Sequence, residues 1–489
     1  MSMVVQHNMQ AANANRMLGI TSGAQAKSTE KLSSGYKINR AADDAAGLTI
    51  SEKMRKQIRG LDKASSNAQD GVSSVQTAEG ALTEVHSMLQ RMNELAVQAA
   101  NGTNSKDTDR KAIQDEIDQL NTEIDRVAET TKFNEIYLLK GDDGEKTVNM
   151  NAHDAGLKGD LVSSGNSATF TMKALSAGDS VSIGGKNYTI GSTADEAKAL
   201  IVAGTDAAKK SYTINGKEYK VGDTKIYASD GTTELTKADL GLTGTTSAVL
   251  ADLQTLAGKS GAKVSDGTTT LTVMTDDKDA TGAANPDGVD DNDKSVISAD
   301  HAYKLVQTEL LAANSIGDTN GTAAVEQDNT NKNVFKITLG SADVANTLSF
   351  SLHVGADADM TNKITVDIDT MNTANLGIKG LNVTDKSGTA ATYAIDAISD
   401  AISKVSSQRS ALGAVQNRLE HTIDNLDNIS ENTSSAESRI RDTDMAKEMV
   451  NYSKNNILAQ AGQSMLAQAN QSNQGVLFVS YTHLTLPTN

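Results

Sequence analysis

Apolar positions recur at helical spacing over a long stretch of the first third of the chain. Between residues 61 and 99 they are separated by steps of three or four, so they share one stripe of a helix, close to a heptad seam. The stripe consists of Leu61, Ala64, Ala68, Val72, Val75, Ala78, Leu82, Val85, Leu89, Met92, Ala96 and Ala99. The pattern predicts one long helix, and Asn101-Gly102 is typical of its end.

The same spacing predicts further helices in both outer thirds. A second helix is expected to start near Ser105 or Asp107, and the Ala-rich, Pro-free segment 8–32 is predicted to be helical. In the last third, a long helix is followed by a polar break around Ser434-Ser435 and then by a final helix. The apolar positions of the second helix are Ile113, Ile117, Leu120, Ile124 and Val127. Those of the long helix in the last third are Ile395, Ile398, Ile402, Val405, Leu412, Val415, Leu419, Ile423, Leu426 and Ile429. Those of the final helix are Ile440, Met449, Ile457, Ala461, Met465 and Ala469.

Helices of this length need a partner surface for their apolar stripes, because little of their stability comes from the isolated helix. The simplest arrangement packs the first and last thirds side by side, with both termini at the same end. We therefore expect a fold that is mainly α at both termini, a long antiparallel coiled-coil-like helical bundle, with a β-rich central insertion. The class is multi-domain α+β.

The middle of the chain alternates polar and apolar residues and is rich in turn residues. Asn215-Gly216 between two alternating segments is a strong hairpin signal, because both central turn positions favour positive φ. Strands are predicted at residues 186–190, 211–214, 217–221, 268–274, 334–339, 347–354 and 363–368, with a polar loop at residues 276–293. We expect one or two small β-rich domains between residues 180 and 354.

Composition narrows the classes of partner. The 489 residues carry a formal net charge of −17, which disfavours nucleic acid and anionic membranes as partners. The chain has no Cys, so disulfides and thiolate chemistry are excluded. No run of about 18 apolar residues predicts a membrane span. The amino terminus lacks a basic segment followed by an apolar one, so we expect any export to proceed without a cleaved signal peptide.

No constellation of residues predicts catalysis, a cofactor or a metal. The seven His are scattered, and no His-Glu-x-x-His is present. The acidic run at residues 287–293 lacks the spacing of a calcium-binding EF-hand loop, and no P-loop pattern surrounds Gly184-Gly185. We predict that the protein is not an enzyme and has no catalytic, cofactor-binding or metal-binding residues.

Several motifs in both outer thirds resemble the terminal signatures of bacterial flagellin. They are EKLSSGYKINRAADDAAGL at residues 30–48, LQRMNELAVQ at 89–98, EIDRV at 123–127, AESRIRDTDMA at 436–446 and NILAQAG at 456–462. The similarity covers about residues 1–142 and 373–477, in the family's order. The resemblance implies a structural subunit that polymerises into the extracellular filament of the bacterial flagellum and serves motility.

The resemblance also implies a division into domains. Residues 1–44 and 433–477 would form an inner helical domain, and residues 45–175 and 373–432 a helical core domain. Residues 176–372 would form the variable surface region. The implied partners are copies of the chain itself, the flagellar cap and hook-associated proteins, an export chaperone at the C-terminal helix, and the flagellin-sensing Toll-like receptor of vertebrates.

Two sets of site residues follow from the resemblance. The receptor-binding positions are Gln90, Arg91, Leu95 and Glu116, where the leucine would be an apolar anchor and the arginine and glutamate would supply charged hydrogen bonds. The positions at a polymerisation or domain joint are Arg40, Asp43, Asp44, Ile440, Arg441 and Asp442. A polar loop without contacts to other subunits is the simpler interpretation of Asp43-Asp44, and filament packing is the alternative role of the receptor-binding set.

The last residues depart from the flagellin pattern. Residues 478–489 form an atypical tail, and its threonines and Pro487 are unfavourable for a continuing helix.

Two other classes of protein are alternatives to a flagellin. One is a hook–filament junction protein, which would share the terminal helices. The other is a surface enzyme or adhesin in residues 176–372, which a glycan-binding screen of that segment would detect.

Overall fold

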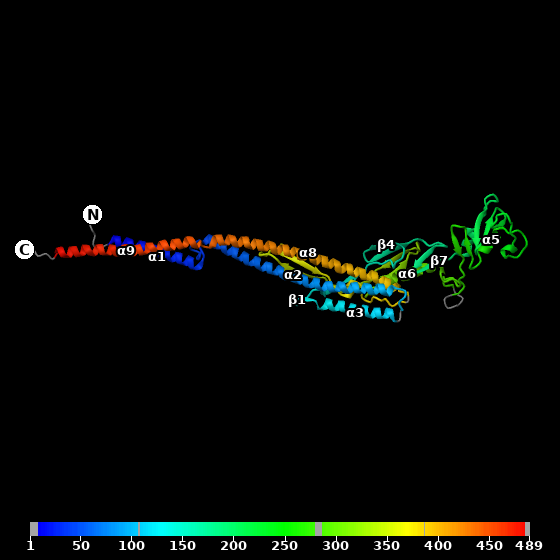
Figure 1. The fold of residues 1–489 in the computed structure, drawn as a ribbon, viewed down its shortest axis with the longest axis horizontal. Helices are drawn as coiled ribbons and strands as arrows, with labels where there is room; N and C mark the ends of the chain where they lie inside the picture. Colours follow the sequence, from blue (N-terminus) through cyan, green and yellow to red (C-terminus); the bar gives the residue numbers. More distant parts are fainter. Residues whose placement is uncertain (1–7, 106–107, 279–285, 386, 485–489) are drawn as a thin grey trace, which may run out of the picture. The chain divides into compact units, whose positions relative to one another are not determined.

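The computed structural model describes residues 8–105, 108–278, 286–385 and 387–484 of the chain. The chain separates into two compact units, which are described one after the other (Figure 1). Unit 1 contains the chain up to residue 73, residues 351–366 and the chain from residue 415 on. Unit 2 contains residues 74–350 and 367–414. Two long helices, α2 (Ala45–Ala100) and α8 (Thr389–Arg441), contribute to both units.

The terminal helices of unit 1 form an antiparallel pair. Helix α1 (Met9–Ser34) lies along α9 (Met445–Leu484), and the Asn8 side chain, which caps α1, donates a hydrogen bond to the carbonyl oxygen of Ala469 at 3.0 Å. The early part of α2 pairs with the late part of α8 in the same sense, since Ser65 Oγ donates to Asp427 Oδ1 at 3.0 Å. The predicted antiparallel helical bundle is therefore confirmed.

A β-hairpin covers the α2–α8 pair in unit 1. Strands β17 (Leu348–His353) and β18 (Lys363–Ile368) form a two-stranded sheet, with the short helix η2 (Met360–Asn362) before β18. Gly71 of α2 lies beneath this hairpin, and a Cβ atom there would lie 2.2 Å from Leu352 Cδ1. A larger residue there would displace the Leu352 side chain, which packs with the cluster that buries Ala68 and Leu419.

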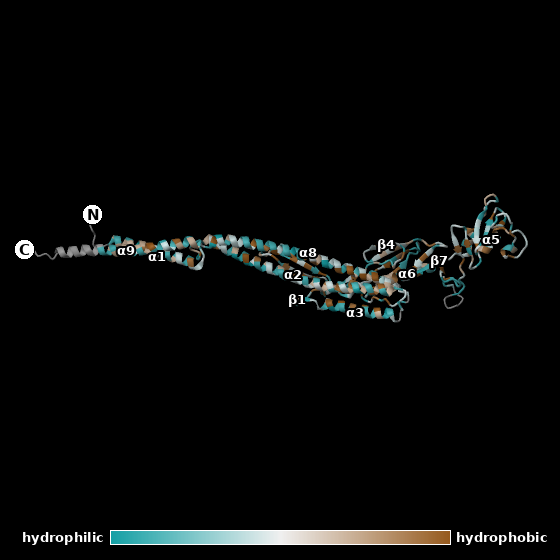
Figure 2. Ribbon diagram, in the orientation of Figure 1, coloured by the Kyte–Doolittle hydropathy of each residue, from teal (hydrophilic) through white to brown (hydrophobic). Residues whose placement is uncertain are grey.

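The helical part of unit 2 is built on the predicted stripe of α2. Leu82, Leu89 and Met92 are fully buried, and α3 (Asp109–Thr130) buries Ile117 and Ile124. Hydrophilic and hydrophobic residues are interspersed along these helices (Figure 2).

Helix α3 begins slightly later than the sequence predicted. Its N-cap is Thr108, because Ser105 forms a turn ahead of the helix. The Ser105 amide donates to Asp109 Oδ2 at 3.0 Å, and its carbonyl oxygen accepts from the Arg110 amide at 2.9 Å. Asp107, the other predicted start, lies outside the described residues.

The rest of unit 2 consists of strands and short helices. The sheets have the orders β1-β2, β14-β15-β5-β4, β13-β7-β6, β10-β9-β8-β11-β12 and β16-β3. The strand bounds are β1 (Lys132–Phe133), β2 (Ile136–Tyr137), β3 (Asp142–Asn149), β4 (Gly159–Ser164), β5 (Ser167–Met172), β6 (Ser180–Ile183), β7 (Lys186–Ile190), β8 (Lys210–Ile214), β9 (Lys217–Val221), β10 (Ile226–Ala228), β11 (Lys263–Ser265), β12 (Thr270–Thr272), β13 (Val296–Ile297), β14 (Ala324–Gln327), β15 (Val334–Thr338) and β16 (Ser341–Asn346). The helices are α4 (Ala194–Leu200), η1 (Ala238–Leu240), α5 (Leu250–Ala257), α6 (Ala299–Asn314) and α7 (Thr373–Leu376).

Two hydrophobic clusters organise these strands. Helix α6 packs with the β14-β15-β5-β4 sheet, where Phe170 and Phe335 are fully buried with ring centroids 6.4 Å apart. Helices α4 and α5 pack with the β10-β9-β8-β11-β12 sheet. The predicted β8–β9 hairpin is confirmed, since Asn215 and Gly216 have φ values of 49° and 79°.

Four sequence expectations need correction. Strands begin at Lys132, within the third that was expected to be helical, and α4, α5 and α6 lie in the region expected to be β-rich. Helix α8 continues through Ser434-Ser435 to Arg441, because serine costs a helix only a fraction of a kcal/mol. Helix α9 continues through the start of the atypical tail to Leu484, since isolated threonines are similarly tolerated. Pro487 lies outside the described residues.

Candidate functional site

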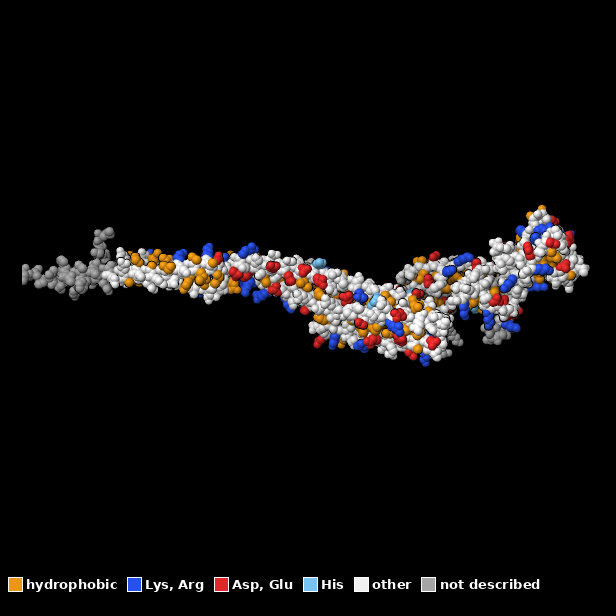
Figure 3. All heavy atoms as spheres, viewed as in Figure 1, with side chains coloured by type: hydrophobic (Ala, Val, Ile, Leu, Met, Phe, Trp, Pro, Cys, Tyr) orange, Lys and Arg blue, Asp and Glu red, His pale blue; other side chains and the backbone are white. Residues whose placement is uncertain are grey.

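The α1–α9 pair of unit 1 exposes an unusual number of large apolar side chains. On α9, Val450 is 68% exposed, Ile457 66% and Met465 61%, and on α1 Ile20 is 62% exposed. These side chains gather over α1 and α9 in the space-filling view (Figure 3). A groove of about 780 Å³ lies between the two helices, lined on either side by residues such as Met17 and Met465. An exposed apolar surface of this kind is typical of a protein–protein contact.

The segment that follows α1 is tied by backbone hydrogen bonds to the end of α8. The Lys37 amide donates to the Arg441 carbonyl oxygen at 2.6 Å, and the Thr443 amide donates to that of Gly35 at 2.9 Å. Tyr36 and Asp442 form an isolated β-bridge between these two bonds. We call residues 35–44 together with residues 440–444 the joint. It ends α8 and starts α9, which explains why the helix break lies here and not at Ser434.

The side chain of Arg441 is the centre of the joint. Its guanidinium lies over the Tyr36 ring, 4.7 Å from the centroid, and Arg441 Nη1 donates to Glu52 Oε1 of α2 at 2.6 Å. This hydrogen bond from Arg441 is the main cause that holds the pKa of Glu52 below its usual value. Glu52 and Tyr36 were not among the predicted site residues. Tyr36 lies within the quoted motif, but nothing in the sequence places Glu52 near Arg441.

The other predicted joint residues make contacts within the same chain. Asp43 Oδ2 accepts from the amides of Arg40 and Asn39 at 3.1 and 3.3 Å, and these bonds lower the Asp43 pKa. Arg40 also pairs with Glu30 at 2.8 Å. Asp44 Oδ1 accepts from the Gly47 amide at 2.9 Å and so caps α2.

Ile440 is half-buried and Asp442 is exposed, although the Asp442 backbone belongs to the joint. The structure therefore brings together Arg40 with Asp43 and Arg441 with Asp442, both within the joint. The exposed side chains of Arg40 and Asp442 leave two of its charges accessible at the surface.

The second predicted set lies on α2 and α3 in unit 2. Arg91 Nε donates to Glu116 Oε1 at 2.9 Å, and Arg91 Nη1 donates to Glu94 Oε2 at 3.1 Å. These two glutamates raise the Arg91 pKa, Glu116 having the larger effect. Gln90 is exposed and hydrogen-bonded to His86 at 3.0 Å. Arg91, Gln90 and Glu116 therefore form one exposed polar surface.

Leu95 differs from the rest of its set. Its side chain is only 1% exposed, so it is not an exposed anchor in this chain. The spacing of four residues from Arg91 placed it one turn further along the same helix. The spacing alone did not show that this position is buried.

A buried arginine that the sequence analysis missed positions this surface. Arg110 at the start of α3 is 2% exposed, and its guanidinium donates to the carbonyl oxygens of Ala99, Asp385 and Asn101 at 2.8, 2.9 and 3.2 Å. It therefore joins the end of α2 and the segment before α8 to α3. The sequence does show an arginine next to the predicted start of this helix. Its burial could not be predicted, because arginines are usually exposed.

The acidic run at residues 287–293 uses its central carboxylate within the loop. Asp290 is 3% exposed; its Oδ2 accepts from the Thr275 amide at 2.7 Å, and its Oδ1 accepts from the Asn292 and Asp293 amides at 2.9 Å. Among the residues that the structure describes, no three acidic or histidine side chains are grouped as a metal would need. Within the same ranges, no helix has the length and apolar content of a membrane span.

Comparisons with known proteins identify the family. The bacterial flagellin N-terminal helical region matches residues 5–143, and the bacterial flagellin C-terminal helical region matches residues 395–479. A flagellin of Clostridium tyrobutyricum is 38% identical over 476 residues, which is 96% of this chain and 100% of that protein. The chain belongs to the bacterial flagellin family. A flagellin of Bacillus subtilis (strain 168) is 34% identical over 476 residues, covering 97% of this chain and 99% of the relative.

Membership of the flagellins settles the main alternatives. The chain is a structural subunit of the flagellar filament, assembles with copies of itself, and is not an enzyme. The junction-protein alternative is set aside, because the full-length relatives are flagellins. The solved structure of FliC from Burkholderia pseudomallei covers 71% of this chain and 99% of that one at 18% identity, with a TM-score of 0.25, which is too low to support any argument.

Proposed function

We propose that the free flagellin subunit is bound by the flagellin-sensing Toll-like receptor of vertebrates through Gln90, Arg91 and Glu116. The observation that supports this proposal is the hydrogen-bonded network in which Arg91 is held between Glu94 and Glu116 on an exposed surface. Side chains that are already held in place lose little conformational freedom on binding. Charged hydrogen-bonding groups also give directional contacts to a partner.

Leu95 has a supporting role in this proposal. Because it is buried and lies one helical turn after Arg91, it would keep the polar surface in shape and would not insert into the receptor. Leu95→Ala should therefore reduce both receptor affinity and the stability of the helical part of unit 2. Glu116→Ala should reduce affinity and leave stability nearly unchanged, since its pair with Arg91 is exposed.

A binding titration against the receptor ectodomain tests the proposal. We expect Glu116→Ala and Leu95→Ala each to weaken binding about tenfold or more. The matched control is Glu234→Ala, which removes another exposed ion pair, the one between Lys225 and Glu234, from a different part of unit 2. Its affinity should equal that of the unchanged chain. Unchanged affinity in both test variants would refute the proposal.

We also propose a division of the chain into domains, which assigns a place in the filament to each part. Residues 1–44 and 433–477 would be the inner helical domain, 45–175 and 373–432 the core domain, 176–372 the surface region, and 478–489 an atypical tail. The exposed apolar side chains of α1 and α9 support the inner assignment, because they need a covering surface that one chain does not provide. In the filament, neighbouring copies would supply that cover.

The joint would set the direction between the inner and core helices during polymerisation. Its backbone bonds and the Arg441–Glu52 contact hold residues 35–44 against the end of α8. Arg40, Asp43, Asp44, Ile440, Arg441 and Asp442 would thus act in polymerisation, Arg40 and Asp442 by contacts to a neighbouring copy and the others by holding the joint. Arg441→Ala should lower the rate of filament growth from seeds, followed by light scattering, while the free chain stays folded. Growth at an unchanged rate would contradict this role.

Export requires that the apolar surface of α9 be covered before assembly. We expect the flagellin export chaperone to bind α9 at the side chains that include Val450, Ile457 and Leu458. Delivery to the extracellular filament would then use the growing structure and no cleaved signal peptide. The cap and hook-associated proteins would meet the same terminal helices. Loss of chaperone co-purification in Ile457→Ser, with retention in the exposed-valine control Val162→Ser, is the expected result.

A further inference from the structure

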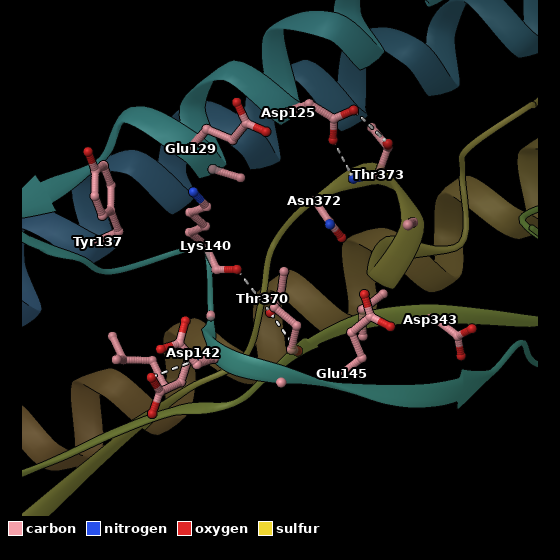
Figure 4. Close-up of a pocket in the computed structure, with 18 of the residues that line it drawn as sticks. Asp125, Glu129, Tyr137, Lys140, Asp142, Glu145, Asp343, Thr370, Asn372 and Thr373 are labelled. Carbon is pink, nitrogen blue, oxygen red and sulfur yellow. Dashed lines mark hydrogen bonds between the residues drawn. The ribbon is translucent and has the colours of Figure 1, made fainter.

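A groove in unit 2 has no assigned role in the contacts described above. Its volume is about 1010 Å³, and it lies between the second half of α3, the β1–β2 hairpin and the start of β3 (Figure 4). Residues 370–374, which include the start of α7, and strand β16 close its other side. We call it the α3 groove. All of its walls belong to unit 2, so its shape does not depend on the placement of the other unit.

The walls of the α3 groove carry carboxylates of two kinds. Asp125 and Asp343 are used for structure, because Asp125 accepts from the Thr373 amide at 2.8 Å and Asp343 accepts from Thr147 Oγ1 at 2.7 Å. Glu129, Asp143 and Glu145 are different. Their side chains are exposed, and within the described ranges no group donates a hydrogen bond to their carboxylates and none forms an ion pair with them.

The α3 groove is also partly apolar. Ile136 and Tyr137 of the β1–β2 hairpin are 44% and 43% exposed at its edge, and Lys140 lies over the Tyr137 ring at 5.4 Å from the centroid. Acidic walls beside an exposed aromatic and an aliphatic side chain fit a segment that is both basic and amphipathic. A simple cation would use only the acidic part of this surface.

The same chain carries such a segment on the first turns of α2, in unit 1. Four exposed cationic residues follow at steps of three, three and four, which places them within an arc of about 120° at 100° per residue. The buried Leu61 lies on the other side of the helix, the buried Ala64 lies at the edge of the stripe next to Lys53, and Ile50, at 47% exposure, precedes the cations. We call this surface the basic stripe. It consists of Lys53, Lys56, Arg59 and Lys63.

The basic stripe has few partners within its own chain. In the described part of the structure, Lys53, Lys56 and Lys63 form no ion pair, and the Arg59 guanidinium donates only to the Arg55 carbonyl oxygen at 3.4 Å. A cationic surface of this length is notable in a chain of net charge −17. The net negative charge favours repulsion between copies, which a basic surface facing an acidic one would offset.

We propose that the basic stripe of one copy docks in the α3 groove of a neighbouring copy in the filament. The groove and the stripe are different surfaces, so the contact is heterologous, and repeating it adds copies in one direction without closing. Lysines and Arg59 of the stripe would pair with Glu129, Asp143 and Glu145. Ile50 would contact the exposed face of the β1–β2 hairpin.

Cysteine cross-linking in intact filaments tests this contact directly, because the chain has no cysteine of its own. Three double variants combine Glu145→Cys with Lys56→Cys, Arg59→Cys or Lys63→Cys, so that the result does not depend on one register. Filaments of each are treated with a short bismaleimide and separated under denaturing conditions. We expect a ladder of covalent multimers in at least one variant, because every copy offers both halves of the contact.

Control variants distinguish the proposed contact from non-specific cross-linking. Each single-cysteine variant should give no ladder, and neither should Glu145→Cys combined with Lys173→Cys, whose lysine is equally accessible but lies outside the stripe. If all three test variants form filaments and give only monomers or dimers, the proposed contact is refuted. A monomer with altered mobility would show a contact within one chain and would also refute it.

Charge reversal gives an independent readout. Lys56→Glu and Glu145→Lys should each raise the critical concentration for polymerisation, and the combined variant should restore it towards that of the unchanged chain. Circular dichroism of the free subunits checks that each variant is folded. Additive defects in the combined variant would overturn the proposal. The receptor proposal is tested separately by the titration described above, because Glu116 does not line the α3 groove.

Discussion

Two helices of this flagellin both carry large apolar side chains, and these side chains have opposite surroundings. Along α2 in unit 2, Leu82 and Leu89 are fully buried by neighbouring elements of the same chain. Along α9 in unit 1, Ile457 and Met465 are 66% and 61% exposed. A helical apolar period shows that a helix has a face to cover, and it does not show whether the cover comes from the same chain or from another one.

The difference indicates where each helix obtains its stability. The α2 stripe contributes to folding of the free subunit, since its burial is complete before assembly. We expect the apolar side chains of α9 to contribute mainly to assembly, since Val450, Ile457 and Met465 are exposed to water. Substitutions in the two stripes should therefore separate folding from polymerisation.

The largest effect is expected in the buried stripe. Leu89→Ala should lower the free energy of unfolding by about 2–5 kcal/mol, because it removes a buried side chain and leaves a cavity. Guanidinium unfolding of the free subunit, followed by the helical signal in circular dichroism, measures this loss. Several units unfold in this chain, so the midpoint of the helical transition is the quantity to compare. A shift equivalent to less than about 0.5 kcal/mol would mean that the stripe is not the core.

A smaller effect is expected in the exposed stripe, and it should fall on assembly alone. Ile457→Ser should leave unfolding of the free subunit nearly unchanged and raise the critical concentration for polymerisation. Burial of most of one isoleucine is worth about 1–2 kcal/mol, which corresponds to roughly five- to thirty-fold. Val162→Ser on β4 is a matched control, since Val162 is 65% exposed. If Ile457→Ser and Val162→Ser raised the critical concentration equally, the exposed side chains of α9 would have no special role in assembly.

The smallest effect concerns the joint, through pH. Folding lowers the pKa of Glu52, chiefly through Arg441, and that of Asp43 through the amides of Arg40 and Asn39. A carboxylate with a lowered pKa stabilises the folded state above its usual value, about 4.3 for glutamate and 3.9 for aspartate, and loses that contribution as pH falls through the lowered pKa. The joint should therefore loosen as pH falls from about 5 towards 3.

Hydrogen exchange of the Lys37 amide measures this loosening, because that amide donates to Arg441 across the joint. Its protection factor should fall with pH, while that of buried α2 amides near Leu89 stays high. In Glu52→Gln the fall should be smaller. Equal protection at pH 6 and pH 3 would show that the lowered pKa values do not stabilise the joint.

The helical regions could be predicted well because their signal is periodic and local. The stripes of α2 and α3 and the β8–β9 hairpin follow from spacing and turn chemistry. The break at Asp442 could not be predicted, because it depends on backbone bonds to a segment some 400 residues away in the chain. The strands from Lys132 to Met172 were missed, since short strands carry few alternating positions.

The site residues divide in the same way. The resemblance named Arg91, Glu116 and Arg441 as site residues, but the contacts of Glu52, Glu94 and Arg110 required the fold. Each of these three is defined by a partner that is distant in the sequence or lies on another helix turn. Leu95 shows the converse, since a residue within a recognised motif proved to be buried.

The sequence by itself determined that this chain forms long paired helices at both ends and belongs with the flagellins, because apolar spacing and contiguous motifs are local properties. Only the tertiary structure decided which apolar stripes are covered within the chain and which remain exposed. The physical reason is that burial depends on what packs against a helix face, and the residues of that face do not specify its neighbour.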